Sequence, residues 1–144
     1  MDINKLNKKI YVIGVFDLFH RGHLEILRRS KELGGKLLVA INGDQMTAKY
    51  KRRPYFLEED RLELVKACKY VDEAFIVNQF DHKQILIDKE IDIIVHGDDW
   101  EKKSYMKQIR VSEDFLERNN IELKLLSYTK GISTSNLIKN IKHT

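Results

Sequence analysis

Five short, apolar, β-branched runs recur along the chain, separated by segments with helical periodicity. Each run is too short for a buried helix and is bounded by Gly, Asp or Asn. This alternation builds a parallel sheet covered on both faces, and near-continuous apolar strands fit burial on both sides. The sequence therefore predicts an α/β fold with an open parallel sheet of about five strands. The predicted strands are Ile10 to Ile13, Leu37 to Ile41, Ala74 to Val77, Ile91 to Val95 and Leu123 to Leu126.

Helical patterns fill the intervals between these runs. A short helix is expected near residues 83–89, and the helix after it is expected to end near Asn119 and Asn120. The basic stretch from Lys49 to Arg53 is expected to be a loop, and residues 1–9 a polar lead-in. The apolar positions behind the other helices are Leu24, Leu27 and Leu33; Leu62, Val65 and Cys68; Tyr105, Ile109, Phe115 and Leu116; and Leu137, Ile138 and Ile141 in 136–141.

Length and composition narrow the class of protein. The 144 residues suit a single domain spanning 1–144, and no apolar run approaches the roughly 20 residues of a membrane span. The single cysteine, Cys68, and the lack of a secretory signal at the N-terminus favour a cytoplasmic location. The 26 Lys and Arg exceed the 22 Asp and Glu by four, which suits an anionic ligand but is also common on solvated surfaces.

The segment after the first strand carries two histidines around a glycine. His20 lies just before a helix that begins near Gly22, and His23 lies in its first turn. Both imidazoles can therefore face the unpaired N–H groups of the helix N-terminus, which attract an anion together with the helix dipole. Gly22 lets the backbone approach a phosphate, and Gly14 allows a tight exit from the strand. The residues alone leave two solvated histidines or a metal pair open, although no cysteine or further histidine at ligand spacing accompanies them.

Two further motifs follow the fourth and fifth strands. Gly97-Asp-Asp-Trp100 offers backbone and carboxylate acceptors for an amino group, whereas a plain turn, with Trp100 as core packing, explains the same residues. Gly131-Ile-Ser-Thr-Ser135 precedes the last helix and supplies its N-cap. A capped N-terminus rich in hydroxyls and N–H groups also suits phosphates.

Together these segments resemble a known enzyme family. Gly14-Val-Phe-Asp-Leu-Phe-His20-Arg-Gly-His23 is similar to the His-x-Gly-His signature of the nucleotidyltransferase superfamily in its cytidylyltransferase form. Tyr70-Val-Asp-Glu73, His96-Gly-Asp-Asp-Trp100 and Gly131 to Ser135 follow in the order seen in bacterial glycerol-3-phosphate cytidylyltransferases. The likeness extends from about Ile10 to Ile141 and implies a Rossmann-like fold.

The resemblance also implies a reaction and a set of site residues. The substrates are CTP and a small phosphorylated acceptor, with Mg²⁺ as cofactor, Asp17 as a candidate ligand, and a homodimer as the assembly. The catalytic residues are His20, His23, Lys51 and Arg52, and the acceptor is bound by Arg61 and Lys69. The nucleotide is bound by Gly14, Val15, Phe16, Asp17, Gly22, Gly97, Asp98, Asp99, Trp100, Ile132, Ser133, Thr134 and Ser135.

This chain departs from the glycerol-phosphate enzymes at two places. Lys69 stands where they have arginine, and Tyr128-Thr-Lys130 stands where they usually have Arg-Thr-x. Lysine keeps the charge but loses the bidentate fork for a phosphate. Glycerol 3-phosphate is the first expected acceptor. The alternatives are an amino-alcohol or amino-acid-derived phosphate for a surface polymer, or adenylyl transfer to a sugar phosphate or flavin. A CTP-binding sensor and a nucleic-acid-binding domain are the non-enzyme alternatives, and no basic stripe interleaved with aromatic residues supports the latter.

Overall fold

The computed structural model describes residues 3–98, 101–127 and 131–143 and contains a five-stranded parallel sheet in the order β3-β2-β1-β4-β5. The strands are β1 (Lys9–Gly14), β2 (Lys36–Asn42), β3 (Glu73–Val77), β4 (Ile93–Gly97) and β5 (Glu122–Leu126). The helices are α1 (Ile3–Leu6), α2 (Arg21–Lys31), α3 (Asp44–Tyr50), α4 (Glu58–Lys66), α5 (Lys83–Asp88), α6 (Lys102–Gln108), α7 (Glu113–Arg118) and α8 (Thr134–Lys142).

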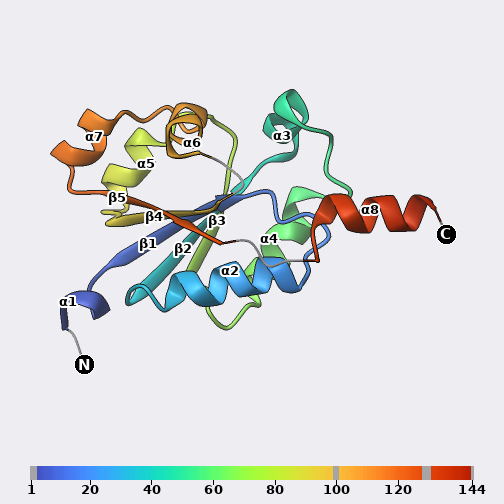
Figure 1. Ribbon diagram of the computed structural model, residues 1–144, viewed down its shortest axis with the longest axis horizontal. Coiled ribbons are helices and arrows are strands. Elements are labelled where there is room, and N and C mark those ends of the chain that lie inside the picture. Colours follow the sequence, from blue (N-terminus) through green and yellow to red (C-terminus); the bar gives the residue numbers. More distant parts are fainter. Residues whose placement is uncertain (1–2, 99–100, 128–130, 144) are drawn as a thin grey trace.

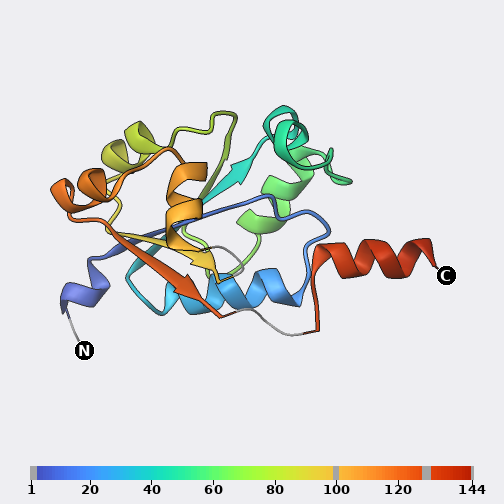
Figure 2. The same ribbon diagram turned by 45° about the horizontal axis from the view of Figure 1, so that its top comes forward.

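Helices cover both faces of the sheet. Figure 1 shows α2 and α4 on one side and α5, α6 and α7 on the other, while α8 extends away from the sheet in both ribbon views (Figures 1 and 2). Side chains alternate along each strand, so Ile10 and Val12 of β1 pack with Leu27 and Val65 on the α2–α4 face. Tyr11 packs with the residues of α5, α6 and α7 on the opposite face. The predicted α/β sheet with helices on both faces is confirmed.

One helix and three element boundaries differ from the sequence prediction. The helix expected to run through Tyr105 and Phe115 is two helices, because Arg110 has a φ of +63° and the Ser112 side chain begins α7 by accepting a hydrogen bond from the Phe115 amide at 3.1 Å. The predicted basic loop begins inside α3, which ends at Tyr50. Leu33 lies beyond α2, and β4 begins two residues later than predicted.

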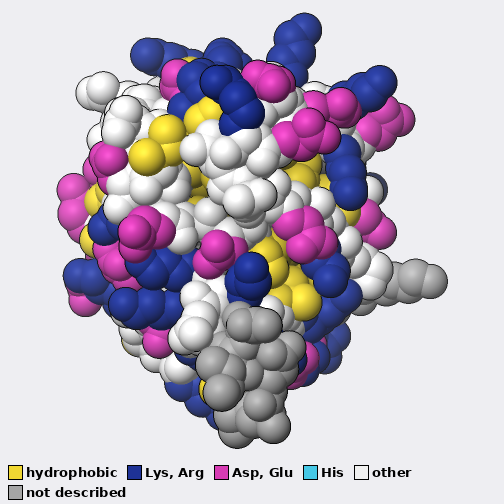
Figure 3. All heavy atoms as spheres, turned by 90° about the vertical axis from the view of Figure 1, so that its left-hand side faces the viewer, with side chains coloured by type: hydrophobic (Ala, Val, Ile, Leu, Met, Phe, Trp, Pro, Cys, Tyr) yellow, Lys and Arg dark blue, Asp and Glu magenta, His cyan; other side chains and the backbone are white. Residues whose placement is uncertain are grey.

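The surface shown in Figure 3 has mixed charge, and the C-terminal helix α8 is exposed. On the face shown in Figure 3, Lys and Arg side chains are interspersed with Asp and Glu. No residue of α8 is fully buried, and Ile141 is 66% exposed. Among the described residues, none of the helices has the length and apolar composition that crossing a bilayer requires.

Candidate active site

A cavity of about 610 Å³ opens at the carboxyl ends of the strands. It lies beside β1 and β4, which are neighbours in the sheet although the chain leaves β1 for β2 on the other side. Such a switch point is where open α/β sheets bind ligands, and the volume is that of an ordinary small-molecule site. Its walls come from the β1–α2 turn, α3 and the loop after it, the loop before α5, the end of β4, α6 and the start of α8.

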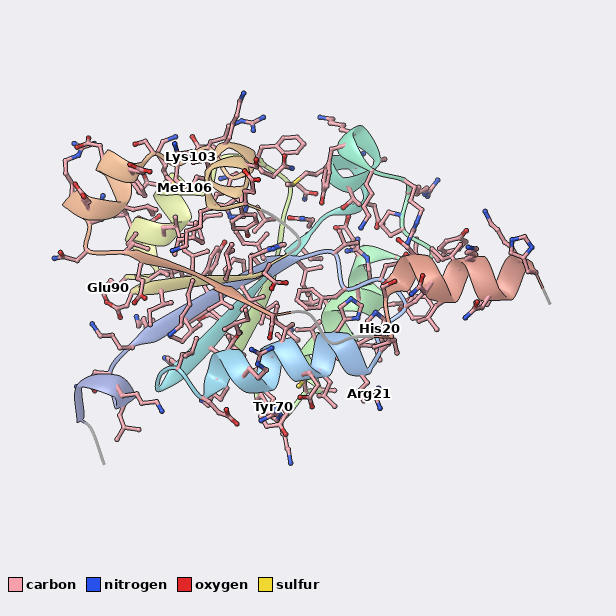
Figure 4. The ribbon with its side chains drawn as sticks, viewed as in Figure 1. His20, Arg21, Tyr70, Glu90, Lys103 and Met106 are labelled. Carbon is pink, nitrogen blue, oxygen red and sulfur yellow. The ribbon has the colours of Figure 1, made fainter. Side chains whose placement is uncertain are left out.

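His20 and His23 are held by the backbone at the N-terminus of α2 (Figure 4 labels His20). The Nδ1 of His20 accepts a hydrogen bond from the Gly22 amide at 2.9 Å, and the Nδ1 of His23 accepts one from the His20 amide at 3.1 Å. An accepting nitrogen carries no proton, so in each neutral ring the proton lies on Nε2. The two rings stack with centroids 3.9 Å apart. The turn therefore places two neutral N–H donors at the cavity, that of His20 lying 3.4 Å from Thr134 Oγ1.

The surroundings of the pair keep both imidazoles neutral. Burial against Phe16 and Phe19 lowers the pKa of His23 to about 3, helped by repulsion between the charged forms of the two imidazoles and by the charge of Lys51. Burial also lowers the pKa of His20. Near pH 7 the two imidazoles are thus neutral hydrogen-bond donors and not imidazolium cations. A triphosphate would meet preformed N–H groups.

Gly22 is required by the position of the His20 ring. A Cβ on Gly22 would lie 2.7 Å from Cε1 and 2.9 Å from Nδ1 of His20. Gly22→Ala is therefore expected to displace the imidazole and to lower kcat at least about 10-fold. Helix propensity would not explain such a loss, because alanine favours a helix over glycine by about 1 kcal/mol. Steady-state kinetics with a thermal melt checks it, and Arg21→Ala, at the exposed neighbouring position, is the control. Unchanged kcat would show that the ring tolerates the contact.

Asp17 ties the basic loop to the turn. Its Oδ2 accepts hydrogen bonds from Arg52 at 2.8 Å and from the Tyr55 amide at 2.9 Å, and its Oδ1 accepts one from the Phe56 amide at 2.9 Å. Burial alone would raise the pKa of Asp17, but these two amides and the Arg52 guanidinium hold it below its usual value. The carboxylate is 2% exposed and fully engaged, so it does not fit the role of a magnesium ligand. The described residues contain no cluster of three or more His, Cys, Asp or Glu that suits a metal ion.

The two catalytic cations predicted from the basic stretch both line the cavity. Lys51 is exposed and lies close enough to His23 for its charge to lower the pKa of that ring. Arg52 is positioned by the Asp17 ion pair and by the Tyr55 ring, whose centroid is 4.7 Å from the guanidinium carbon. Both charges therefore stand beside the histidine pair.

The start of α8 closes the site from the other end of the sequence. Ser133 caps α8 by accepting a hydrogen bond from the Asn136 amide at 3.1 Å. Thr134 Oγ1 donates to the Asp17 carbonyl at 2.9 Å and lies 3.4 Å from Nε2 of His20. Ile132 and Ser135 line the same cavity. The capping interpretation of this motif holds, and the same residues also contact the histidine turn.

Only some of the remaining residues predicted to bind the nucleotide line the cavity. Gly14, Val15, Phe16, Gly22 and Gly97 line the cavity. Asp98 is exposed, and its amide donates to the Leu126 carbonyl at 2.8 Å. Asp99 and Trp100, like the segment Tyr128 to Lys130, lie outside the described residues.

Arg61 and Lys69, predicted to bind the acceptor, do not line the cavity. Arg61 is fully buried, and its guanidinium donates to three backbone carbonyls and to Asp44. It therefore fixes the strand ends instead of contacting a ligand. Lys69 is exposed over the Tyr70 ring and precedes β3, at the amino ends of the strands. The prediction of acceptor contacts from these two side chains is corrected accordingly.

Several lining residues belong to no sequence motif that we assigned to the site. The sequence signal that could have found Phe80 and His82 is their position just after β3. The carboxyl ends of parallel strands lie at one edge of the sheet, where ligands bind. These residues include Phe80, His82, Tyr105, Gln108 and Ile109, and Tyr50 of the basic stretch lines the same cavity.

Comparison with known proteins identifies the family of this chain. The sequence profile of a family described as cytidylyltransferase-like matches residues 11–140. Glycerol-3-phosphate cytidylyltransferase of Bacillus subtilis (strain 168) is 37% identical over 135 residues, 93% of this chain and 97% of the relative. Ethanolamine-phosphate cytidylyltransferase of Arabidopsis thaliana is 43% identical over 103 residues, 69% of this chain and 24% of the relative.

A solved structure extends the agreement to the fold. The lipopolysaccharide core biosynthesis protein from Thermoplasma volcanium GSS1 superposes with a TM-score of 0.69 at 28% identity, covering 87% of this chain and 98% of that one. The profile match spans most of the chain, and the B. subtilis relative is covered almost completely. The chain therefore belongs to the cytidylyltransferase-like family.

Proposed function

We propose that this protein transfers the cytidylyl group of CTP to the phosphate of a small phosphorylated alcohol, releasing pyrophosphate. The observation that carries the proposal is the pair of neutral Nε2–H donors of His20 and His23 at the head of a cavity that also holds Lys51 and Arg52. Glycerol 3-phosphate is the first candidate acceptor, because the B. subtilis relative bears that name and is matched along 97% of its length.

The proposed step is an in-line displacement at the α-phosphorus of CTP. A phosphate oxygen of the acceptor forms the new P–O bond, the bond to the bridging oxygen of pyrophosphate breaks, and that oxygen keeps the electron pair. His20 and His23 donate hydrogen bonds to the non-bridging oxygens, where negative charge grows in the transition state. Lys51 and Arg52 neutralise the departing pyrophosphate. The start of α8 contributes Ser133 and Thr134 to the phosphate site.

Other components of the proposal rest on chemistry and on the family. Mg²⁺ is proposed to arrive as part of the substrate, bound to the triphosphate, since Asp17 is engaged and the described residues offer no dedicated metal cluster. Gly97 and the motif that it begins are proposed to recognise cytosine. A single domain, a homodimeric assembly and a cytoplasmic location complete the proposal.

Pyrophosphate release tests this function directly. The protein is incubated with Mg²⁺ and either CTP or ATP, together with glycerol 3-phosphate, ethanolamine phosphate or a sugar phosphate. We expect release only with CTP and one of the phosphorylated alcohols. Release with ATP alone would replace cytidylyl by adenylyl transfer. CTP binding without release for any acceptor would contradict the enzyme assignment and favour a sensor.

Ser133→Ala separates capping from nucleotide binding. Loss of the bond to the Asn136 amide is expected to destabilise the protein by about 1 kcal/mol. If the hydroxyl also contacts the triphosphate, the Kd for CTP is expected to rise about 3- to 10-fold as well. Calorimetric titration and a thermal melt measure the two effects. Ser127→Ala, at a lining residue outside the motif, is the control, and an unchanged Kd would return Ser133 to a purely structural role.

A further inference from the structure

The cavity reaches from the α2 face of the sheet to the α5–α6 face. The residues assigned to the nucleotide come from the β1–α2 turn, the end of β4 and the start of α8. A second region, which we call the α5–α6 subsite, is formed by α3, the loop before α5, and α6. Its residues are Tyr50, Phe80, His82, Tyr105, Gln108 and Ile109.

His82 is the polar anchor of this subsite. It is 1% exposed, and its Nδ1 lies 2.9 Å from the hydroxyl of Tyr11, which is fully buried in β1. Among the described residues the Tyr11 hydroxyl has no other hydrogen-bond partner. It therefore donates its proton to Nδ1 of His82, since a buried hydroxyl is normally hydrogen-bonded. The proton of the neutral His82 ring therefore lies on Nε2.

The Nε2–H of His82 is left to a ligand. Within the described part of the chain no group accepts a hydrogen bond from it, although the ring lines the cavity. Burial lowers the pKa of His82 to about 4, against the opposing charge of Asp81, and burial also keeps the Tyr11 phenol protonated by raising its pKa. The ring lines the cavity, so a ligand oxygen there can accept this hydrogen bond.

Charge decides which part of an acceptor enters this subsite. The basic side chains of the described lining are Arg29, Lys51 and Arg52, and none of them belongs to the α5–α6 subsite. A dianionic phosphate is therefore held beside Lys51 and the histidine pair, where attack on CTP takes place. Asp17 is the one acidic residue of the described lining and is already bonded to Arg52 and two amides, so an amine in the subsite would find no carboxylate there.

We propose that the α5–α6 subsite binds the carbon chain of the acceptor, and that His82 selects a phosphorylated polyol by donating a hydrogen bond from Nε2 to one of its hydroxyl oxygens. This proposal rests on the proposed cytidylyl transfer. His82 is a specificity-determining residue in this scheme, and Tyr11 is a positioning residue that fixes its tautomer.

A pair of acceptors isolates the hydroxyl. Glycerol 3-phosphate and n-propyl phosphate share a three-carbon chain and a phosphate, but the second lacks both hydroxyls. In pyrophosphate release with Mg²⁺ and CTP, the wild-type protein is expected to favour glycerol 3-phosphate at least about 10-fold in kcat/KM. His82→Phe keeps an aromatic ring of similar size without the N–H group, and it is expected to abolish most of this preference while leaving the KM for CTP unchanged.

Two further variants separate recognition from folding. His82→Gln retains an N–H donor near the position of Nε2 and is expected to retain most of the preference. Tyr11→Phe removes the group that fixes the tautomer and is expected to raise the KM for glycerol 3-phosphate without changing the KM for CTP. The same preference in the wild type and in His82→Phe would overturn the role of His82. A wild type that favours ethanolamine phosphate would overturn the polyol class, and the absence of release with every acceptor would overturn the proposed function itself.

Discussion

His20→Asn is expected to lower kcat about 10²- to 10³-fold with little change in Tm. Asparagine is among the best N-cap residues, and its Oδ1 can accept the Gly22 amide in place of the imidazole Nδ1. The substitution therefore preserves the start of α2 and removes the Nε2–H. His23→Asn follows the same logic, because its Oδ1 can accept the His20 amide. The two variants separate the donor function of each ring from its structural function.

The kinetics and the melts must be read together. Steady-state pyrophosphate release gives kcat and KM, and thermal unfolding reports the fold. His143→Asn, which makes the same change at an exposed histidine beyond α8, is the matched control and is expected to behave as the wild type. Turnover within about threefold of the wild type in His20→Asn or His23→Asn would contradict the assigned role. Loss of Tm along with kcat would point instead to a structural role for the ring.

The sheet could be predicted because its signal is local. A buried parallel strand is an apolar, β-branched run, and each of the five runs became a strand within about two residues. Ile91, predicted to begin the fourth strand, is buried although it precedes β4, so its apolar character marked burial and not the strand boundary. The division of α6 from α7 depends on the left-handed backbone of Arg110, for which arginine gives no sequence signal.

The candidate site was predictable to the extent that it lies within continuous motifs. The turn around His20 and His23 and the start of α8 are such motifs, and in the structure they meet through Thr134. His82 lines the cavity with its ring bonded to Tyr11, 71 residues earlier, and no local pattern records a contact between two elements so far apart. Arg61 was assigned to the acceptor because its residue type matches the family pattern. The residue type does not reveal that the guanidinium is buried and hydrogen-bonded within the protein.

Arg61→Met is expected to destabilise the protein by about 3–5 kcal/mol, because it removes a fully buried cation and the four groups that accept its hydrogen bonds lose their donor. The guanidinium donates to the Val15, Asn42 and Phe56 carbonyls at 2.7–3.0 Å and to Asp44 at 2.7 Å. Val15 follows β1 and Asn42 ends β2, so this one side chain joins two strand ends to the basic loop. Methionine fills much of the same volume but offers no donor.

The expected loss in Tm for Arg61→Met is about 10 °C for a chain of this length. Thermal unfolding measures it, and Arg53→Met, at an exposed arginine in the adjoining loop, is the matched control with an expected change near zero. Because Arg61 holds the base of the loop that carries Lys51 and Arg52, the KM for both substrates should rise at temperatures where the variant is still folded. A direct acceptor contact predicts the opposite pattern: an unchanged Tm and a higher KM for the acceptor alone. That outcome would reinstate Arg61 as a binding residue and would mean that its side chain leaves the buried position in the working enzyme.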